Sequence, residues 1–211
     1  MVAGQEGREF MFVGGLAVII MVFTVTGVAD VPMTDKWFET YSRLRTGYLP
    51  VAVVFLLRTL AWVVEAAMGV IICIVVVGPL TGLSELSIDL LPLLPICGVM
   101  MVTTAVTGLA VVAFAVAKRA DVFVGNSAAA ALTIFSGALI PPGIIGWVDT
   151  IGTVLPLRHG LMAVRAALAG EPWLAHLGWE LLAGAGWAVV AWLAYTRQAR
   201  RARVSGTDDF A

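Results

Sequence analysis

The sequence predicts an all-α, polytopic transmembrane helical protein, and two observations support this fold class. First, 60% of its 211 residues are hydrophobic and only 13% are charged, whereas soluble domains contain about 25% charged residues. Second, it contains several apolar stretches of the roughly 20 residues that a helix needs to cross a hydrocarbon core ~30 Å thick. Five stretches qualify, at residues 10–29, 49–83, 90–117, 122–140 and 173–196, and residues 1–211 are expected to form a single transmembrane domain.

Basic residues are unevenly distributed among the segments that join these stretches. If the N-terminus lies outside, the cytoplasmic segments hold nine of the 13 lysines and arginines. Lysine and arginine in short loops favour the cytoplasmic side of the membrane. The sequence therefore predicts five spans, with the N-terminus outside and the C-terminus inside. The first stretch lacks a clear basic leader and cleavage site, which favours a retained span over a signal peptide.

Composition and motifs argue against several functions. The net charge of -1 provides no basic field, so no nucleic-acid partner is expected. No Gly-x-x-x-x-Gly-Lys-Ser/Thr phosphate loop occurs, so the chain is not expected to bind a nucleotide itself. Cys73 and Cys97 lie singly within apolar stretches and predict neither a disulfide nor a metal cluster. No catalytic residue, metal site or cofactor of the chain's own is therefore predicted.

A charged segment, residues 34–47, separates the first two stretches. Thr34 and Asp35 can cap a helix, and Gly47 can end it. Apolar residues recur along the segment at helical spacing, which predicts an amphipathic helix on the cytoplasmic side. Two interpretations remain open: a connector that lies on the membrane surface, or a docking helix for a cytoplasmic partner. The candidate docking residues are Trp37, Phe38, Tyr41, Arg43, Leu44 and Arg45.

The segment between the last two stretches, residues 141–172, combines prolines with helical patterns. Pro141 and Pro142 cannot continue a helix, so they are expected to end the fourth stretch. Apolar spacing then predicts two short helices, the second ended by Gly170. Irregular backbone at membrane depth must be surrounded by protein or by a water-filled cavity. The segment is therefore predicted to form a re-entrant external cap, with an ordinary surface loop as the alternative.

Two ionisable residues, Arg58 and Glu65, lie inside the second stretch. An arginine at the centre of a membrane helix costs about 2.5–3.5 kcal/mol on insertion scales, so both need an explanation. They are about two helical turns apart on one face, where a direct pair would be loose. Arg58 is expected to extend to the cytoplasmic surface. Glu65 is expected to face a subunit interface, a translocation path or a packing partner.

The order of these features resembles that of the ABC type-2 export permeases. The string from Ser136 to Pro172 is similar to the family's region around its last spans, and residues 38–50 resemble its coupling helix. The cap motif comprises Ser136, Gly137, Pro141, Pro142, Pro156, His159 and Arg165, and Gly160 and Gly170 also match. The five predicted spans correspond to the second to sixth of the family. A first span encoded upstream, or a shortened variant, is therefore expected.

The resemblance implies the membrane-spanning permease subunit of an ATP-driven exporter in the bacterial inner membrane. Separate ABC ATPase subunits would bind ATP and Mg²⁺ and dock on the coupling helix, so the chain itself is not expected to be an enzyme. A second permease chain, identical or different, and membrane lipids are the other implied partners. The substrate would be a hydrophobic or amphipathic drug, lipid or polymer.

Two other functions remain as alternatives. One is an ion- or proton-coupled secondary transporter or channel, in which Glu65 and Glu180 would relay protons, although no internal repeat supports it. The other is a scaffold or redox subunit, for which the two histidines, His159 and His176, are poorly placed as haem ligands.

Overall fold

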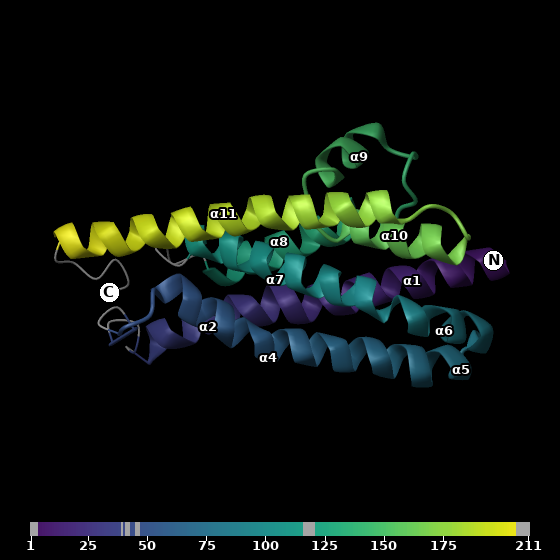
Figure 1. Cartoon of the computed structure of the whole chain (residues 1–211), viewed down its shortest axis with the longest axis horizontal. Coiled ribbons are helices and arrows are strands. Elements are labelled where there is room, and N and C mark those ends of the chain that lie inside the picture. Colours follow the sequence, from purple (N-terminus) through teal and green to yellow (C-terminus); the bar gives the residue numbers. More distant parts are fainter. Residues whose placement is uncertain (1–3, 39, 41–42, 45–46, 116–120, 206–211) are drawn as a thin grey trace.

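The computed structural model of the protein describes residues 4–38, 40, 43, 44, 47–115 and 121–205. The secondary structure of these residues is helical throughout, which confirms the predicted all-α, polytopic class. The helices lie along one another in an elongated bundle (Figure 1). One end of the bundle holds the chain's N-terminus and is called the N-terminal end below. The other end, which holds Trp37 and Pro50, is called the opposite end.

The first long helix combines three segments, α1 (Gln5–Met21), the π-helical η1 (Val22–Gly27) and α2 (Val28–Trp37). The helix therefore continues into the segment where a separate helix over residues 34–47 was predicted. The hydroxyl of Thr34 donates to the Asp30 carbonyl of the same helix, at 2.7 Å, and does not cap a new helix. The predicted start at Thr34 is thus corrected: the first helix ends only at Trp37.

Three further long helices complete the set. The second joins α4 (Val51–Ile72), η2 (Cys73–Val77) and α5 (Gly78–Leu80). The third joins α6 (Ser84–Leu90), the 3-10 turn η3 (Leu91–Leu93) and α7 (Leu94–Ala115), and the last is α11 (Leu174–Ser205). By length and apolar composition, four helices among the described residues can cross a membrane. The third starts at Ser84, before the predicted start at residue 90, because α6 and η3 continue directly into α7.

The fourth predicted span, residues 122–140, is a shorter helix, α8 (Asp121–Phe135). Its 15 residues rise about 22 Å, less than the ~30 Å of a hydrocarbon core. The prolines do not end it, which corrects the sequence prediction. The helix stops ahead of Pro141 because Gly137 adopts a left-handed backbone, with φ +80°, in the turn that follows.

Two short helices follow α8, where the sequence predicts them. They are α9 (Gly146–Gly152) and α10 (Arg158–Leu168), and Gly170 follows α10 with φ +73°. In Figure 1, α9 projects sideways from the bundle, whereas α10 lies along it. α10 packs against α11, α7 and α1 and buries one face, which includes Leu161 and Val164.

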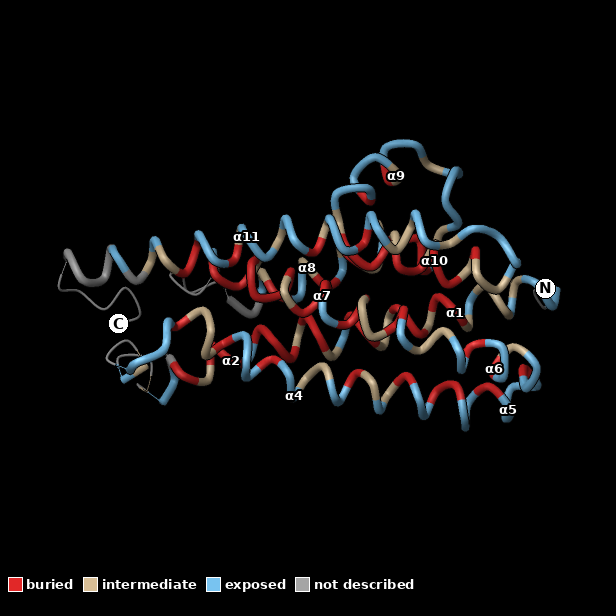
Figure 2. Tube along the Cα trace, in the orientation of Figure 1, coloured by how far each residue is buried: buried red, intermediate tan, exposed pale blue. Residues whose placement is uncertain are grey.

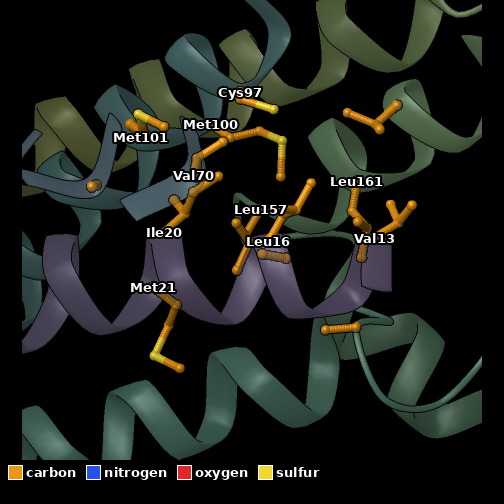
Figure 3. Packing of buried hydrophobic residues seen from close by; sticks show 14 of the residues in the cluster. Val13, Leu16, Ile20, Met21, Val70, Cys97, Met100, Met101, Leu157 and Leu161 are labelled. Carbon is orange, nitrogen blue, oxygen red and sulfur yellow. The ribbon is translucent and has the colours of Figure 1, made fainter. Parts of the chain in front are cut away.

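The core runs along the inside of the bundle, and Figure 2 shows the buried positions turned inward. Its larger cluster draws on α1, α4, α7, α8 and α10, and the close-up in Figure 3 shows part of it. The outer side of α4 instead exposes apolar side chains, among them Leu60, Val64 and Met68. An apolar outer surface on helices of this length is the arrangement of a multi-pass membrane protein.

Candidate functional site

Two aromatic side chains extend into the surroundings at the opposite end of the bundle. Trp37 is the last residue of α2 and Phe38 follows it, and their exposed fractions are 71% and 72%. Of the other predicted docking residues, Arg43 is exposed and Leu44 is half-buried against the cluster around Phe55. Tyr41 and Arg45 lie outside the described residues. The structure thus places four of the six predicted residues, three of them exposed.

The segment that carries these aromatics is held to α4 by an ion pair. The guanidinium of Arg58 donates to the carboxylate of Asp35, which is buried near the end of α2. The hydroxyl of Thr40 donates to the other oxygen of that carboxylate, at 2.9 Å. Asp35 therefore joins the end of α2, the residues that follow it and α4.

The two ionisable residues of the second span do not pair with each other. Arg58 turns to Asp35, whereas Glu65 lies on the exposed side of α4 between Val64 and Met68. A carboxylate on a membrane-facing surface is costly, so this position favours a protein partner or water beside Glu65 over lipid.

The carboxylate of Asp149 connects three parts of the predicted cap. It accepts hydrogen bonds from the Arg158 guanidinium at the start of α10 and from the Gly143 backbone N–H, the latter at 2.8 Å. Arg158 is itself buried and also donates to the Phe135 carbonyl at the end of α8, at 3.3 Å. The hydrogen bond from Arg158 holds the pKa of Asp149 below its usual value.

Arg165 ties α10 to the turn after α8. Its guanidinium donates to the Gly137 carbonyl at 2.8 Å and lies 3.8 Å from the centroid of the Phe10 ring. Burial lowers the pKa of Arg165 to about 10, because a low-dielectric environment disfavours the charged form. Ser136 completes this turn: its hydroxyl oxygen accepts the Ala138 N–H at 3.2 Å.

The remaining predicted cap residues fall into two groups. Pro141 and Pro142 lie exposed in the loop before α9. Pro156 is buried, and His159 is half-buried, with Nε2 2.9 Å from the Thr153 carbonyl oxygen and its ring beside that of Trp179. The structure thus brings Ser136, Gly137 and Arg165 together, and the ring of Pro142 lies beside Gly137.

A second buried carboxylate, that of Glu180, lies where α11, α7 and α10 meet. The backbone N–H of Leu157 donates to both of its oxygens, at 2.8 and 3.0 Å, and the N–H of Gly160 donates to Oε2 at 2.9 Å. The hydroxyl of Thr103 lies 2.5 Å from Oε1. Glu180 is fully buried, so these donors from the protein replace water around its charge.

A cavity of about 390 Å³ opens at the N-terminal end of the bundle. Four carboxylates from α1 and α6 line it together with Arg165 of α10 and apolar side chains, the carboxylates being those of Glu6, Glu9, Glu85 and Asp89. Among the described residues, no group of three or more histidine, cysteine, aspartate or glutamate side chains is arranged to hold a metal ion.

The chain matches the family model described as ABC-2 type transporter over residues 2–169, most of its length. The chain belongs to the ABC-2 type transporter family. No curated protein and no solved structure matches the chain. This ABC-2 protein is therefore a membrane component of an ABC transporter, and the family's members are transport subunits.

The sequence pattern does not indicate the partners of three polar residues of the ABC-2 chain, Asp35, Asp149 and Glu180. Asp35 is predicted as a helix cap, and the arginine that pairs with it lies 23 residues away. The partners of Glu180 are largely backbone N–H groups, which leave no residue-type signature. Glu180 also lies outside the matched range, which ends at residue 169. One signal in the sequence could have indicated these interactions. Arg58 and Glu180 are charged residues within apolar stretches, where a charge needs a partner inside the protein.

Proposed function

We propose that this chain is the permease subunit of an ATP-driven exporter in the bacterial inner membrane. Family membership supports transport, and the sequence contains no phosphate loop of its own. A separate ABC ATPase would therefore bind ATP and Mg²⁺, and a second permease chain, identical or different, would face this one. The substrate would be a hydrophobic or amphipathic drug, lipid or polymer.

The observation that carries the proposal is the exposed pair Trp37 and Phe38 at the opposite end of the bundle. Large aromatic side chains are the common anchors of protein interfaces, because each removes a large apolar area from water. The pair follows Asp35, whose bonds to Arg58 and Thr40 fix the segment to α4. A partner that moves this segment would thereby act on two of the long helices.

Most of the lysines and arginines lie in segments at the same end of the bundle as Trp37 and Phe38. This distribution supports a cytoplasmic position for that end. An ATPase in the cytoplasm would then meet Trp37 and Phe38 directly, with Arg43 at the rim of the contact. Rim charges mainly change association rate and register, whereas buried aromatics contribute most of the binding energy.

Co-purification of the tagged chain with ABC ATPase subunits co-expressed from the same genome tests the proposal. The double variant Trp37→Ala with Phe38→Ala should lose co-purification at least tenfold, because hot-spot aromatics are worth about 2 kcal/mol or more each. Arg43→Ala should reduce it less. Trp147→Ala is the matched control, since Trp147 is equally an exposed aromatic but lies on α9. Parent-like binding by the double variant, at equal membrane levels, would reject the docking role.

The alternative of an ion- or proton-coupled transporter predicts a different energy source for transport. An exporter of the proposed kind moves ethidium, a cationic aromatic dye, out of cells or proteoliposomes only with the ATPase and ATP present. A coupled transporter moves it without either and stops when the ion gradient is dissipated. Glu180 gives the alternative no support, because its oxygens are already occupied by hydrogen bonds from the protein.

A further inference from the structure

The start of α10 has no acceptor of its own for its first N–H groups. The residue before the helix is Leu157, whose side chain has no polar atom, and no side-chain cap is formed there. Helix N-termini leave their first N–H groups without partners inside the helix, so buried ends need an external acceptor. The carboxylate of Glu180, from α11, accepts from Leu157 and Gly160 and supplies this acceptor. Its negative charge also lies at the end of α10 where the helix dipole favours an anion.

Two glycines bring the helices close enough for this contact. A Cβ atom at Gly160 would overlap the side chain of Met100 on α7, and it would also lie 3.3 Å from the carboxyl carbon of Glu180. On α11, a Cβ atom at Gly184 would overlap the side chain of Thr103. The three helices thus meet at a point where larger side chains do not fit.

The backbone of Leu157 is strained at this junction. Its φ is +79°, a left-handed conformation that residues with a branched, bulky side chain rarely adopt. Such residues persist where the surrounding structure holds them. Here the N–H is held by Glu180, and the side chain lies in the large core cluster together with Leu161 and Leu16, as Figure 3 shows.

We propose that Glu180 is a positioning residue for transport, which fixes the start of α10 to α7 and α11. The inference rests on the proposed exporter function. A displacement of α11 relative to α7 shifts the carboxylate that holds α10, so the cap follows movements of the long helices. Glu180 acts through α10 and has no contact with substrate in this role.

Hydrogen exchange of the purified full-length chain tests the anchoring directly. In Glu180→Gln, one oxygen is replaced by an N–H₂ group that cannot accept, so exchange of the Leu157 and Gly160 amides should rise about tenfold. Thr103→Val should raise it by a smaller factor, whereas Thr103→Ser keeps the hydroxyl and should resemble the parent. Thr104→Val is the matched control, because Thr104 is also buried on α7 but its hydroxyl bonds the Met100 carbonyl of its own helix.

Export of ethidium per ATP hydrolysed, with the partner ATPase present, tests the role in transport. Glu180→Gln should lower this ratio at least threefold while the ATPase still co-purifies, and Thr103→Val should lower it more than Thr103→Ser. A general loss of folding would reduce binding and export together, so the ratio separates positioning from a purely structural role.

Three results would overturn the inference: parent-like exchange of the α10 amides in Glu180→Gln, faster exchange with an unchanged export ratio, or equal behaviour of the two Thr103 variants. The last comparison decides the matter even if Glu180→Gln does not reach the membrane. Failure of the exporter function itself would look different, because the parent chain would then export no ethidium with ATP and the ATPase.

Discussion

Individual residues set how closely the helices of this bundle approach one another. Gly14 on α1 faces the turn after α8, and a Cβ atom there would overlap the carbonyl oxygen of Ala138. The obstacle is backbone, which cannot rotate away as a side chain can. The same turn contains Gly137, whose left-handed φ and carbonyl bond to Arg165 fix its course.

Replacing Gly14 by Ala should therefore destabilise the protein, while Gly15→Ala should not. Overpacking against a fixed backbone costs about 1–3 kcal/mol, whereas nothing lies within 4 Å of a Cβ at Gly15, where alanine also favours the helix. Thermal unfolding of the two variants in detergent compares them directly. Equal unfolding temperatures would show that α1 does not pack against this turn.

For individual residues, the sequence indicated which charged residues need an interaction partner, but it did not indicate which groups those partners are. Arg58 was expected to extend to the cytoplasmic surface, and it does lie toward the opposite end, yet its partner Asp35 was assigned to a helix cap. The pairing depends on how α2 and α4 cross, which residue spacing along one helix does not encode. Glu180 is harder still, because it binds Leu157 and Gly160 through backbone atoms that every residue possesses.

Among the elements, the short helices α9 and α10 could be predicted and the end of α8 could not. Apolar periodicity is a local signal, and it marks both short helices correctly. The proline pair is an equally local signal for a helix end, but the left-handed Gly137 acts earlier along the chain. The structure also assigns the two short helices different environments, with α10 packed in the bundle and α9 projecting from it.

Attachment of α9 should depend on pH through Asp149. The Arg158 hydrogen bond lowers the folded-state pKa of this carboxyl, so its contribution to stability is present above the usual value of 3.8 and is lost as pH falls through the lower folded value. A spin label at the exposed position Thr150, introduced as Thr150→Cys, should become more mobile as the pH falls below the usual Asp value of 3.8.

The variant Asp149→Asn should make the same label mobile at neutral pH and remove the pH dependence. A label that is equally immobile in Asp149→Asn and in the parent would contradict the role of this carboxylate in holding α9 to α10.

On the scale of the whole molecule, hydrophobic length was sufficient to predict a polytopic helical bundle and, with the loop motifs, its family. The boundaries were less accurate, because a helix can continue through residues whose sequence is typical of a cap. Thr34 is such a position, since it lies inside α2. Which end of the bundle faces the cytoplasm follows from the distribution of basic residues and stays a prediction.

Reporter fusions test this orientation. A reporter fused after Arg203 should be cytoplasmic, and one inserted at Ala169, just after α10, should be external, because positive charge is retained on the cytoplasmic side. Activity of both reporters on the same side of the membrane would rule out the predicted topology and the docking proposal that depends on it.

Because α11 is longer than the hydrocarbon core is thick, one end of this helix contacts the lipid headgroups. Its 32 residues extend about 48 Å, some 18 Å more than the hydrocarbon core, so its last turns must pass through the headgroup layer. Arg197 and Arg200 are exposed on those turns, and each arginine near an anionic surface contributes about 1 kcal/mol of attraction. Phosphatidylserine or phosphatidylglycerol would therefore hold this helix end at the surface, and high salt or a purely zwitterionic bilayer would release it. The depth and tilt of α11 are thus set partly by membrane surface potential.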